Sequence, residues 1–458
     1  MHTVTGSGGT PVRAYLHTFG CKANQYDTER MREELEARGW ATVADRAEAE
    51  VIVVNTCTVT NQADAEARRF VRRVRREQPH ARIVVAGCSA ALRAEAYRAM
   101  DEVAEVVEGH DPVAVALAAG ERRRPVQIEV RRPLDRIDLE PVAGALLSSR
   151  RSGTRGWLKV QDGCDRRCSF CATRLARGES RSRPADEVVA EARRLARVHP
   201  ELVVTGIHIG HYGRDLPDAP PLSGLVRRLL DEVPDVRLRL GSVEATEVDD
   251  ALIDLLETSG GRLAPHLHMP LQSGADPVLR RMRRWHTREA YRRRALEIAE
   301  RVWPLGLGAD VITGFPGETD EDHDATRRLI EELPFTYLHV FPFSPRDGTV
   351  AASLPDPVPQ RVAGERAREL RELAQDKGRR YRRARAGEPA RAVREDGGRG
   401  LTEDYLRVRL PSGGDGPWCE GVLTLVEGSD GELTVRARAH ERTSPVPEHL
   451  LTRPARSL

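Results

Sequence analysis

Short β-rich runs that alternate with helical patterns restrict the fold of this chain more than any other feature of its sequence. Between residues 14 and 118, the runs "AYLHTFG", "VIVVNT" and "RIVVAG" do not alternate in polarity, as is typical of buried parallel strands. A helical pattern follows each run. After the first, Met31 and Leu35 share one face and Gly39 is a stop signal, and Pro79 ends the pattern after the second. The alternation predicts a doubly wound α/β domain with a parallel sheet.

The same alternation resumes at residue 157 and predicts a second α/β unit. Its runs are "WLKVQ", "ELVVTG", "VRLRLGS", "HLHMPL", "LGADVITG" and "TYLHVFPFS". They predict a full or partial β/α barrel, closed by a helical segment around residues 361–377. From about residue 385, short alternating runs with Gly-rich turns, such as "PWCEGVLTLVEG", predict a small antiparallel β-barrel.

We therefore predict an α/β multidomain protein, which suits a length of 458 residues. The doubly wound domain covers residues 12–122 and the β/α barrel covers residues 150–377. Residues 123–149 between them are rich in Arg, Pro, Ser and Gly without periodicity, and are interpreted as a linker. The C-terminal β-barrel covers residues 378–455 and begins with a basic lead-in.

Composition excludes several classes of protein. No apolar run approaches the ~20 residues that span a bilayer, and the first residues lack the pattern of a secretory signal. We therefore expect a cytoplasmic protein with no membrane partner, in which clustered cysteines bind metal or do chemistry. Net charge is +2 and only Lys22, Lys159 and Lys377 are lysines, so only local clusters of arginine indicate nucleic-acid binding.

Three of the seven cysteines lie within "QDGCDRRCSFC", as Cys164, Cys168 and Cys171. Their spacing is CxxxCxxC, directly after a predicted strand. Three thiolates are one short of a closed structural zinc site, but they suit a four-iron cluster with one iron open to a ligand. The alternatives are zinc with a remote fourth ligand, or a chance cluster.

Cys21, Cys57 and Cys88 are far apart in sequence, but each follows a predicted parallel strand and precedes a helix. Open α/β sheets bind ligands at that edge, and helix N-termini there favour negative charge. A single cysteine is more often a small buried apolar residue, but three at equivalent strand ends indicate a second site. Cys419 stands alone and is interpreted as a core residue.

The chain resembles the radical S-adenosylmethionine (SAM) methylthiotransferases almost from end to end. The resemblance rests on "TFGCKANQYDTERM", "NTCTVTNQAD", "GCSA", "VQDGCDRRCSFC", "ARGESRSRP", "LHMPLQSGADPVLRRMRRWHT", "DVITGFPGETDED" and "FPFSPRDGTVAA". It implies a radical SAM partial barrel in the centre and a TRAM-like RNA-binding barrel at the C-terminus. One departure is Arg174, where a Pro is frequent in the family, and it leaves the three cysteines of the motif unchanged.

"GCKANQYDTE" with "NTCTVTNQAD" is similar to the branch that methylthiolates threonylcarbamoyladenosine in tRNA, beside the anticodon. The branch that acts on isopentenyladenosine reads nearer "GCQMNxxDS", and the branch that modifies an aspartate of a ribosomal protein reads nearer "GCPKNxVDSE". Those two substrates remain alternatives. A rival from another class is a non-catalytic iron–sulfur RNA-binding regulator, which would not need a SAM pocket.

The resemblance implies two [4Fe–4S] clusters. Cys164, Cys168 and Cys171 would ligate the cluster that binds SAM, and Cys21, Cys57 and Cys88 would hold an auxiliary cluster that carries or supplies sulfur. Around SAM, Phe170 would lie near the adenine and Gly206 near the methionine part. The ribose side would meet Ser242 and Glu244, and Val311 and Gly314 would frame the adenine. From the residues alone, these glycines suit turns, and Glu244 suits either a solvated or an ion-paired carboxylate.

The implied reaction replaces the carbon-2 hydrogen of the modified adenosine with a methylthio group, through a SAM-derived radical. The implied partners are the tRNA anticodon stem-loop, an external electron donor of the flavodoxin or ferredoxin type and a sulfur donor. Two basic segments could contact RNA: "KGRRYRRAR" (377–385) and "RRFVRRVRR" (68–76), although either could be the solvated side of a helix. His266 and His268 could point into the barrel or be core histidines.

Overall fold

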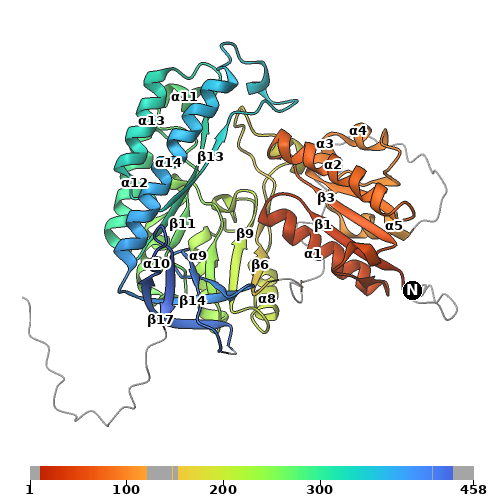
Figure 1. Cartoon of the computed structure of the whole chain (residues 1–458), viewed down its shortest axis with the longest axis horizontal. Coiled ribbons are helices and arrows are strands. Elements are labelled where there is room, and N and C mark those ends of the chain that lie inside the picture. Colours follow the sequence, from red (N-terminus) through yellow and green to blue (C-terminus); the bar gives the residue numbers. More distant parts are fainter. Residues whose placement is uncertain (1–10, 121–146, 148–152, 415, 437–458) are drawn as a thin grey trace, which may run out of the picture.

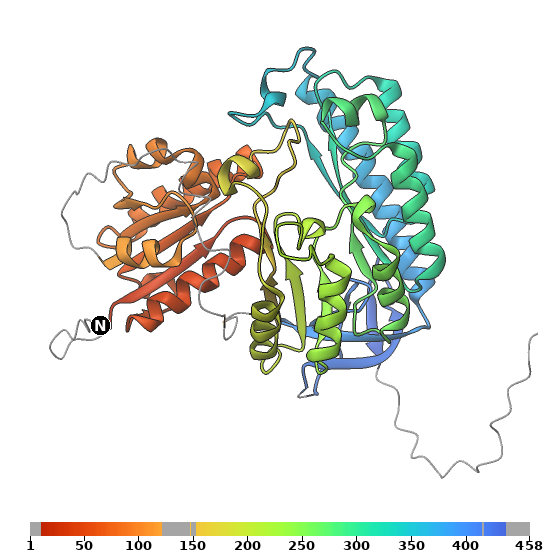
Figure 2. The same cartoon turned by 180° about the vertical axis from the view of Figure 1, so that it is seen from behind.

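The computed structural model describes residues 11–120, 147, 153–414 and 416–436, which form a lateral domain, a central barrel and a small β-barrel beneath it (Figures 1 and 2). Apart from residue 147, the predicted linker at 123–149 lies outside the described residues. Within the described residues, no helix combines the length and the apolar composition that crossing a bilayer requires. The α/β multidomain architecture with a small C-terminal barrel is confirmed.

The N-terminal domain contains a five-stranded parallel sheet in the order β2-β1-β3-β4-β5. Its strands are β1 (Arg13–Thr18), β2 (Ala41–Thr42), β3 (Val51–Thr56), β4 (Arg82–Gly87) and β5 (Glu105–Val106). Its helices are α1 (Lys22–Ala37), α2 (Asn61–Glu77), α3 (Cys88–Leu92), α4 (Ala94–Arg98) and α5 (Pro112–Gly120). This strand order is that of a doubly wound fold, as predicted.

Both faces of this sheet are buried, which explains why its strand sequences do not alternate in polarity. On one face, Val51 and Val53 pack with Met31 of α1 and Val115 of α5. On the other face, Ile52 and Val54 pack with residues of α2 and α4, including Phe70, Val74 and Tyr97. Gly39 has φ +83° immediately after α1, as a helix stop requires. The two-residue edge strands β2 and β5 were too short to predict.

The central domain is a partial barrel of six parallel strands, and all six were predicted. The strands are β6 (Arg155–Lys159), β9 (Glu201–Thr205), β10 (Arg237–Leu240), β11 (His266–His268), β12 (Gly306–Thr313) and β13 (Tyr337–Pro342). They pair as β10-β9-β6 and β11-β12-β13, and parallel bridges between Leu238 and Leu263 and between Ser242 and His268 join the two halves. Their carboxyl ends therefore share one edge, where barrel enzymes place their sites.

Helices cover the outside of the partial barrel (Figure 1). They are α8 (Ala185–Leu195), α9 (Leu222–Glu232), α10 (Asp250–Thr258), α11 (Asp276–Arg281), α12 (Arg288–Arg301), α13 (Asp320–Glu332) and α14 (Gln360–Arg385), whereas the short α7 (Thr173–Arg177) packs against α3 of the N-terminal domain. A two-stranded ribbon of β7 (Gln161–Asp162) and β8 (Arg181–Ser182) holds the ends of the cysteine-rich loop together.

Helix α14 runs through the predicted domain boundary at residue 377, so the basic segment 377–385 is the end of this helix rather than a separate lead-in. Three of its arginines contact the C-terminal barrel: Arg379 pairs with Asp430 at 3.0 Å, Arg382 donates to the Gly431 carbonyl at 2.9 Å, and the buried Arg385 pairs with Asp404 at 2.7 Å. Half of the segment's cations therefore hold two domains together.

The C-terminal β-barrel is closed, with five strands in the order β14-β15-β16-β18-β17. They are β14 (Pro389–Glu395), β15 (Arg399–Leu401), β16 (Arg407–Arg409), β17 (Trp418–Leu425) and β18 (Leu433–Arg436). One departure from the prediction is that β16 and β18 pair in parallel, whereas the other pairs are antiparallel. This arrangement is that of a five-stranded Greek-key barrel.

This small barrel closes the amino end of the partial barrel. Arg239, on β10, donates to the carbonyls of Thr402 and Glu403, each at 2.9 Å. His266, on β11, stacks on Tyr405 with 4.2 Å between ring centroids. The C-terminal barrel thus lies at the end of the strands opposite to the cysteine-rich loop, beneath the β/α barrel in Figures 1 and 2.

Two cysteine trios in the candidate functional site

The barrel trio, Cys164, Cys168 and Cys171, lies on the loop between β7 and α7. Backbone hydrogen bonds fix this loop: the Cys164 N–H donates to the Gly178 carbonyl at 3.1 Å, and the Cys171 N–H donates to the Cys168 carbonyl at 3.2 Å. All three thiols are free and partly exposed. The loop therefore presents three sulfurs from one side at the carboxyl edge of the strands.

Two nitrogen-bearing side chains contact the sulfurs of the barrel trio. His208 Nδ1 lies 3.4 Å from the Cys164 sulfur, and Arg284 Nη1 donates to the Cys168 sulfur at 3.6 Å. Glu247 contacts His208 Nε2 at 2.7 Å and so fixes the imidazole. Donors aimed at sulfur favour its charged form, which is the form that binds metal. The donor set therefore fits a thiolate-ligated iron–sulfur cluster.

Burial raises the pKa of the Cys164 thiol to about 12, although the N–H of Arg166 opposes this rise. The pKa of the Cys168 thiol is also raised by burial, with Arg284 opposing. Both thiols are therefore protonated at neutral pH when no metal is bound, and a bound metal must displace these protons.

The first-domain trio is formed by Cys21, Cys57 and Cys88. Cys21 precedes α1, Cys57 directly follows β3, and Cys88 begins α3 after β4, so all three lie at the carboxyl edge of the sheet. A Cβ atom placed on Gly20 would lie 2.5 Å from the Cys57 sulfur, so only glycine fits beside that thiol. The charge of a Cys88 thiolate acts on the pKa of both other thiols. The structure thus brings together three cysteines that are far apart in sequence.

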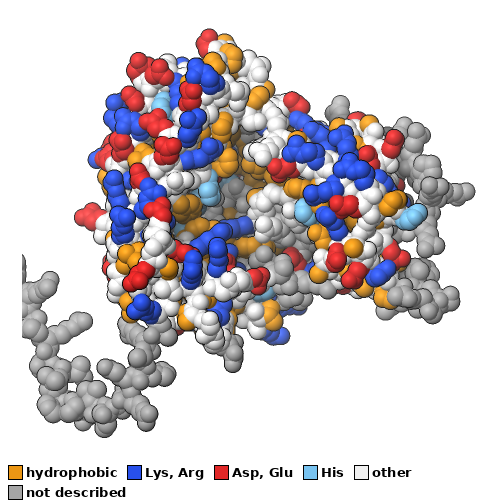
Figure 3. Space-filling view, viewed as in Figure 1, with side chains coloured by type: hydrophobic (Ala, Val, Ile, Leu, Met, Phe, Trp, Pro, Cys, Tyr) orange, Lys and Arg blue, Asp and Glu red, His pale blue; other side chains and the backbone are white. Residues whose placement is uncertain are grey.

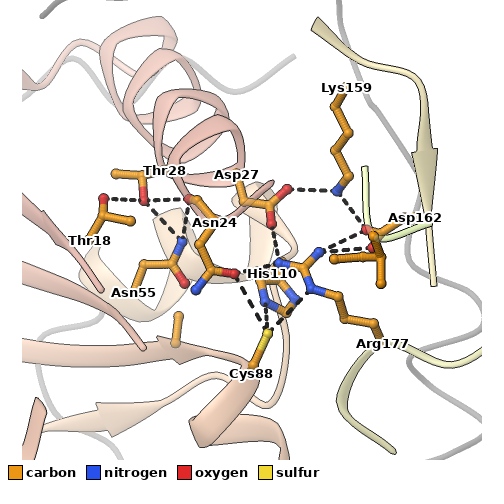
Figure 4. A network of polar contacts seen from close by, with 12 residues as sticks. Thr18, Asn24, Asp27, Thr28, Asn55, Cys88, His110, Lys159, Asp162 and Arg177 are labelled. Carbon is orange, nitrogen blue, oxygen red and sulfur yellow. Dashed lines mark hydrogen bonds and ion pairs between the residues drawn. The ribbon is translucent and has the colours of Figure 1, made fainter. Parts of the chain in front are cut away.

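Cys88 has the most polar surroundings of this trio (Figure 4). Arg177 Nε donates to its sulfur at 3.3 Å, and His110 Nε2 lies 3.4 Å away. Burial alone would raise the pKa of the Cys88 thiol, but Arg177 and His110 together lower it to about 7. In contrast, burial raises the pKa of Cys57 to about 12.

Arg177 connects the two trios. Its guanidinium is buried and donates to both oxygens of Asp162 at 2.9 and 3.0 Å, to Asp27 at 2.7 Å and to Asn24 at 2.6 Å. Lys159 pairs with the same two carboxylates. Asp162 precedes Cys164 by two positions and Asn24 lies in the first turn of α1. The charged groups in Figure 4 therefore join the two sites across the domain interface.

The sequence reasoning did not identify this network, because charged residues are usually exposed. One signal was present: Lys159 is a charged residue inside the apolar run "WLKVQ". A buried lysine in a parallel strand needs a partner, and its partner Asp27 lies 132 positions away on a different domain.

The residues expected around SAM lie at or near the carboxyl edge of the partial barrel. Gly206 directly follows β9, and Ser242 and Glu244 follow β10. Glu244 is buried and paired with Arg284, the residue that contacts Cys168. The ion pair that the sequence suggested for Glu244 is thus present, and it links this carboxylate to the barrel trio.

Two glycines and an aromatic residue of that set have protein neighbours. A Cβ on Gly206 would lie 2.7 Å from the Gln161 carbonyl, and one on Gly314 would lie 2.3 Å from Ala363 Cβ. Phe170 meets Phe315 edge to face with 6.5 Å between ring centroids. Val311 is buried in β12. Close packing therefore explains both glycines without a ligand, and their contact with SAM stays a prediction.

The inner face of the partial barrel carries polar side chains. His268 Nε2 lies 3.3 Å and His339 Nδ1 3.2 Å from the same Asp310 oxygen, and Ser242 Oγ lies 2.9 Å from His268 Nδ1. Of the two histidines that the sequence left undecided, His268 therefore faces this polar group, and His266 is a buried residue packed on Tyr405. Figure 3 shows a hollow between the barrel and the N-terminal domain.

Two family models match the chain. The model described as "Uncharacterized protein family UPF0004" matches residues 13–109, and the model of the Radical SAM superfamily matches residues 158–330. A solved structure, that of the radical S-adenosylmethionine methyltransferase TsrM from Kitasatospora setae, superposes with a TM-score of 0.56 at 18% identity, covering 75% of this chain and 77% of that one. This likeness concerns the fold alone.

Similar sequences include the threonylcarbamoyladenosine tRNA methylthiotransferases MtaB of Rickettsia prowazekii and Bacillus subtilis. The first is 35% identical over 405 residues (87% of this chain, 91% of the relative), and the second is 35% identical over 411 residues (86% and 89%). The tRNA-2-methylthio-N(6)-dimethylallyladenosine synthase of Sorangium cellulosum is also 35% identical, over 388 residues (78% and 76%). Percentage identity therefore does not separate the two tRNA substrates.

Proposed function

The chain belongs to the MtaB-like family of radical SAM methylthiotransferases, which are tRNA-modifying enzymes, and from this membership we propose that it methylthiolates carbon 2 of N6-threonylcarbamoyladenosine beside the anticodon. The observation that carries the proposal is the pair of neighbouring cysteine trios joined by Arg177. One trio suits radical generation and the other suits a sulfur-carrying cluster.

A radical SAM enzyme uses a [4Fe–4S] cluster and SAM, which supply the one-electron chemistry that an aromatic C–H bond requires. We assign the ligands of this cluster to Cys164, Cys168 and Cys171. Arg284 donates to the Cys168 sulfur and stabilises its charged form, and His208 Nδ1 contacts the Cys164 sulfur. Phe170, Gly206, Ser242, Glu244, Val311 and Gly314 are assigned to SAM because they lie at or near the edge that carries this trio.

We assign a second [4Fe–4S] cluster to Cys21, Cys57 and Cys88. Arg177 and His110 stabilise the Cys88 thiolate, and the exposed Cys21 marks the open side of the site. The charged groups around Arg177 fix this trio against the loop of the barrel trio. The chain's own contribution is thus to hold two sulfur-bound sites close enough to act on one nucleoside.

Lys22 supports the threonylcarbamoyl substrate over the isopentenyl one, because only the threonyl group carries a carboxylate. Lys22 follows Cys21 and begins α1, and Tyr26, one turn later on the same side, packs in the barrel core. Burial and the guanidiniums of Arg155 and Arg239 lower the pKa of Lys22 to about 8, with Glu201 opposing. Lys22 forms no ion pair with any residue in the described ranges. We assign it to the carboxylate of the substrate.

Anaerobic turnover of anticodon stem-loops that carry either threonylcarbamoyladenosine or isopentenyladenosine tests the proposal. Mass spectrometry of the nucleosides should show the methylthio product from the first substrate and little from the second. Product from isopentenyladenosine alone would assign the enzyme to the alternative substrate, and no methylthio nucleoside from either RNA would contradict the proposed function.

Lys22→Gln should slow turnover of the threonylcarbamoyl substrate on the order of tenfold, as expected when one charged hydrogen bond of ~1.4 kcal/mol is lost. Arg361→Gln is the control for the loss of one surface charge, because Arg361 lies on α14 and pairs with Glu365 at 2.7 Å. An amide of the threonyl carboxylate should react equally with the wild type and Lys22→Gln. If Lys22→Gln also slows the amide substrate, Lys22 does not recognise the carboxylate.

A further inference from the structure

Helix α2 carries four exposed arginines on one side: Arg69, Arg72, Arg73 and Arg76, which we name the arginine face. Their spacing of i, i+3, i+4 and i+7 places them on a single stripe. The other side of the helix is buried through Phe70, Val71 and Val74. The sequence left open whether these arginines are merely the solvated side of a helix, and the structure gives three observations that bear on this choice.

The first observation is that all four arginines of the arginine face lack an ion pair with a described residue, whereas some exposed arginines on other helices have one. On other helices, Arg361 pairs with Glu365 at 2.7 Å and Arg301 pairs with Asp254 at 2.7 Å. The neighbours of the arginine face also have partners: Arg68 pairs with Asp64 at 2.5 Å and Arg75 donates to the Pro79 carbonyl at 2.7 Å.

The four residues of the arginine face form no ion pair with a described residue, and no unprinted partner compensates their charge. Glu66 lines the groove beside them, where Gln62 donates to it at 2.9 Å, and Glu77 at the end of α2 pairs with Arg46 at 2.8 Å. The stripe therefore holds an excess of positive charge. Figure 3 shows blue side chains gathered over α2 on this side of the N-terminal domain.

The second observation is a groove of about 510 Å³ beside the arginine face. It is lined by His17, Phe19, Glu66, Arg69, Phe70, Arg72, Arg73 and Arg76. His17 stacks on Phe70 with 4.0 Å between ring centroids. Burial, helped by Arg46 and Arg73, lowers the pKa of His17 to about 4, so this imidazole is neutral near pH 7. The groove therefore combines cationic walls with an uncharged aromatic floor, a combination typical of surfaces that bind nucleic acid.

The third observation is the position of α2. The helix begins at Asn61, four positions after Cys57 of the first-domain trio. At 1.5 Å per residue, Arg69 to Arg76 lie roughly 12–23 Å along the helix from that end. A tRNA whose modified base reaches the trios therefore has the backbone of the adjoining stem within reach of this stripe.

We propose that the arginine face binds the phosphate backbone of the tRNA substrate and sets the approach of the anticodon stem. The proposal rests on the tRNA substrate of the proposed function but not on which nucleoside is modified. Contacts to phosphates position a nucleic acid without reading its sequence. The arginine face is therefore expected to affect binding of all tRNA substrates equally.

The test compares the wild type with a variant that carries Arg69→Gln, Arg72→Gln and Arg76→Gln. Arg73 is kept because its guanidinium lies over the Phe70 ring at 5.5 Å. Binding of tRNA is measured between 50 and 200 mM salt. The variant should bind on the order of tenfold more weakly at low salt, and its log–log salt slope should fall by about 2, because each lost phosphate contact removes about 0.7–0.9.

Two further variants test whether a loss of tRNA binding comes from misfolding or from the change in net charge rather than from the arginine face. Arg69→Lys, Arg72→Lys and Arg76→Lys together should keep most of the salt slope. Arg193→Gln, Arg301→Gln and Arg361→Gln together remove the same charge from paired surface positions and should leave both quantities unchanged. Cleavage of SAM should be equal in all variants, and turnover by the glutamine variant should recover at saturating tRNA.

The outcomes distinguish this inference from the proposed function. A wild type that fails to bind tRNA would contradict the proposed function itself. A wild type that binds tRNA, together with a glutamine variant of equal affinity and equal salt slope, would overturn the arginine face alone. Equal losses in the glutamine variant and the paired-position control would show that net charge, and not this surface, governs binding.

Discussion

Each cysteine trio brings three thiols together, but one trio comes from a single loop and the other from three separate strand ends. The barrel trio lies on one loop, and the side chains that contact its sulfurs, His208 and Arg284, come from the same domain. The first-domain trio takes its thiols from three strand ends, and its strongest donor, Arg177, comes from the neighbouring domain. The barrel trio is thus complete within one domain, whereas the first-domain trio is complete only when the two domains are packed together.

This difference shows that a site whose residues come from two domains needs an interface that holds those domains in place. Burying Arg177, Lys159, Asp27 and Asp162 is costly unless every charge is paired, and here each one has partners. The pairing holds only in one arrangement of the domains. The charged interface therefore fixes the position of the dispersed site relative to the local one, which a purely apolar interface would do less specifically.

The sharpest way to break the comparison is to remove each trio separately. Replacing Cys164, Cys168 and Cys171 by Ala should abolish SAM cleavage and leave about half of the iron after anaerobic reconstitution. Replacing Cys21, Cys57 and Cys88 by Ala should leave cleavage to 5′-deoxyadenosine intact and abolish the methylthio product. Iron analysis and mass spectrometry measure both. A wild-type rate of product in the second variant would make that trio structural.

Removing the residue that joins the trios should have the next largest effect. Arg177→Met leaves buried carboxylates short of a cation and should lower the free energy of unfolding by ~3–5 kcal/mol, measured by chemical denaturation. Arg174→Met, on the same short helix, is the control, because Arg174 is partly exposed and its contact with Glu179 is 3.6 Å. Its effect should stay within about 0.5 kcal/mol. Equal effects of the two variants would show that the charged network does not stabilise the interface.

A smaller effect should separate the donors of the two sites. Arg284→Gln removes the guanidinium that donates to the Cys168 sulfur at 3.6 Å and should lower the reduction potential of the barrel cluster by on the order of tens of millivolts, because a donor to sulfur stabilises the reduced form. Arg281→Gln is the control, since Arg281 donates to the Gly317 carbonyl at 2.7 Å and contacts no cysteine among the described residues. An EPR-monitored titration in which only the other cluster shifts would reverse the assignment.

The smallest effect is expected at the seventh cysteine. Cys419 is buried in the core of the C-terminal barrel with Leu423 and Val435. Cys419→Ala should leave the iron content unchanged and lower the free energy of unfolding by about 1 kcal/mol, as a small core truncation does. A loss of iron in this variant would show that Cys419 is a cluster ligand. The assignment of three cysteines to each of two sites would then be wrong.

The sequence predicted the strands that are long and apolar, because such runs are buried on both faces. Strands β3, β4 and β9 fall in this class, whereas β10, β11 and β13 carry arginine or histidine side chains and followed from the alternation of strand and helix patterns. The strand β14 was missed because "PARAVRE" begins with Pro and carries two arginines, and in a small barrel half of each strand faces solvent. The parallel pairing of β16 and β18 depends on tertiary closure and leaves no local signal.

The residues of the candidate site also divide into those that the sequence predicted and those that it did not. The positions of all six cysteines followed from spacing and from strand ends, whereas the groups that act on them did not. His208 lies 44 positions from Cys164, and Arg177 lies 89 positions from Cys88. Histidine and arginine are frequent on surfaces, so their sequence neighbourhoods do not show that they meet a sulfur. Only the packed structure shows which histidine and arginine side chains contact a cysteine sulfur.

The short helix α7 has a consequence for recognising such proteins from sequence. It begins two positions after Cys171 and ends at Arg177. The spacing C-x5-R therefore determines where the Arg177 guanidinium lies relative to Cys88 of the first-domain trio. An insertion or deletion of one residue in a helix rotates every following side chain by about 100°, which would turn this guanidinium away from Cys88. The C-x5-R spacing next to the barrel trio therefore indicates the presence of the first-domain trio, whose cysteines are far apart in the sequence.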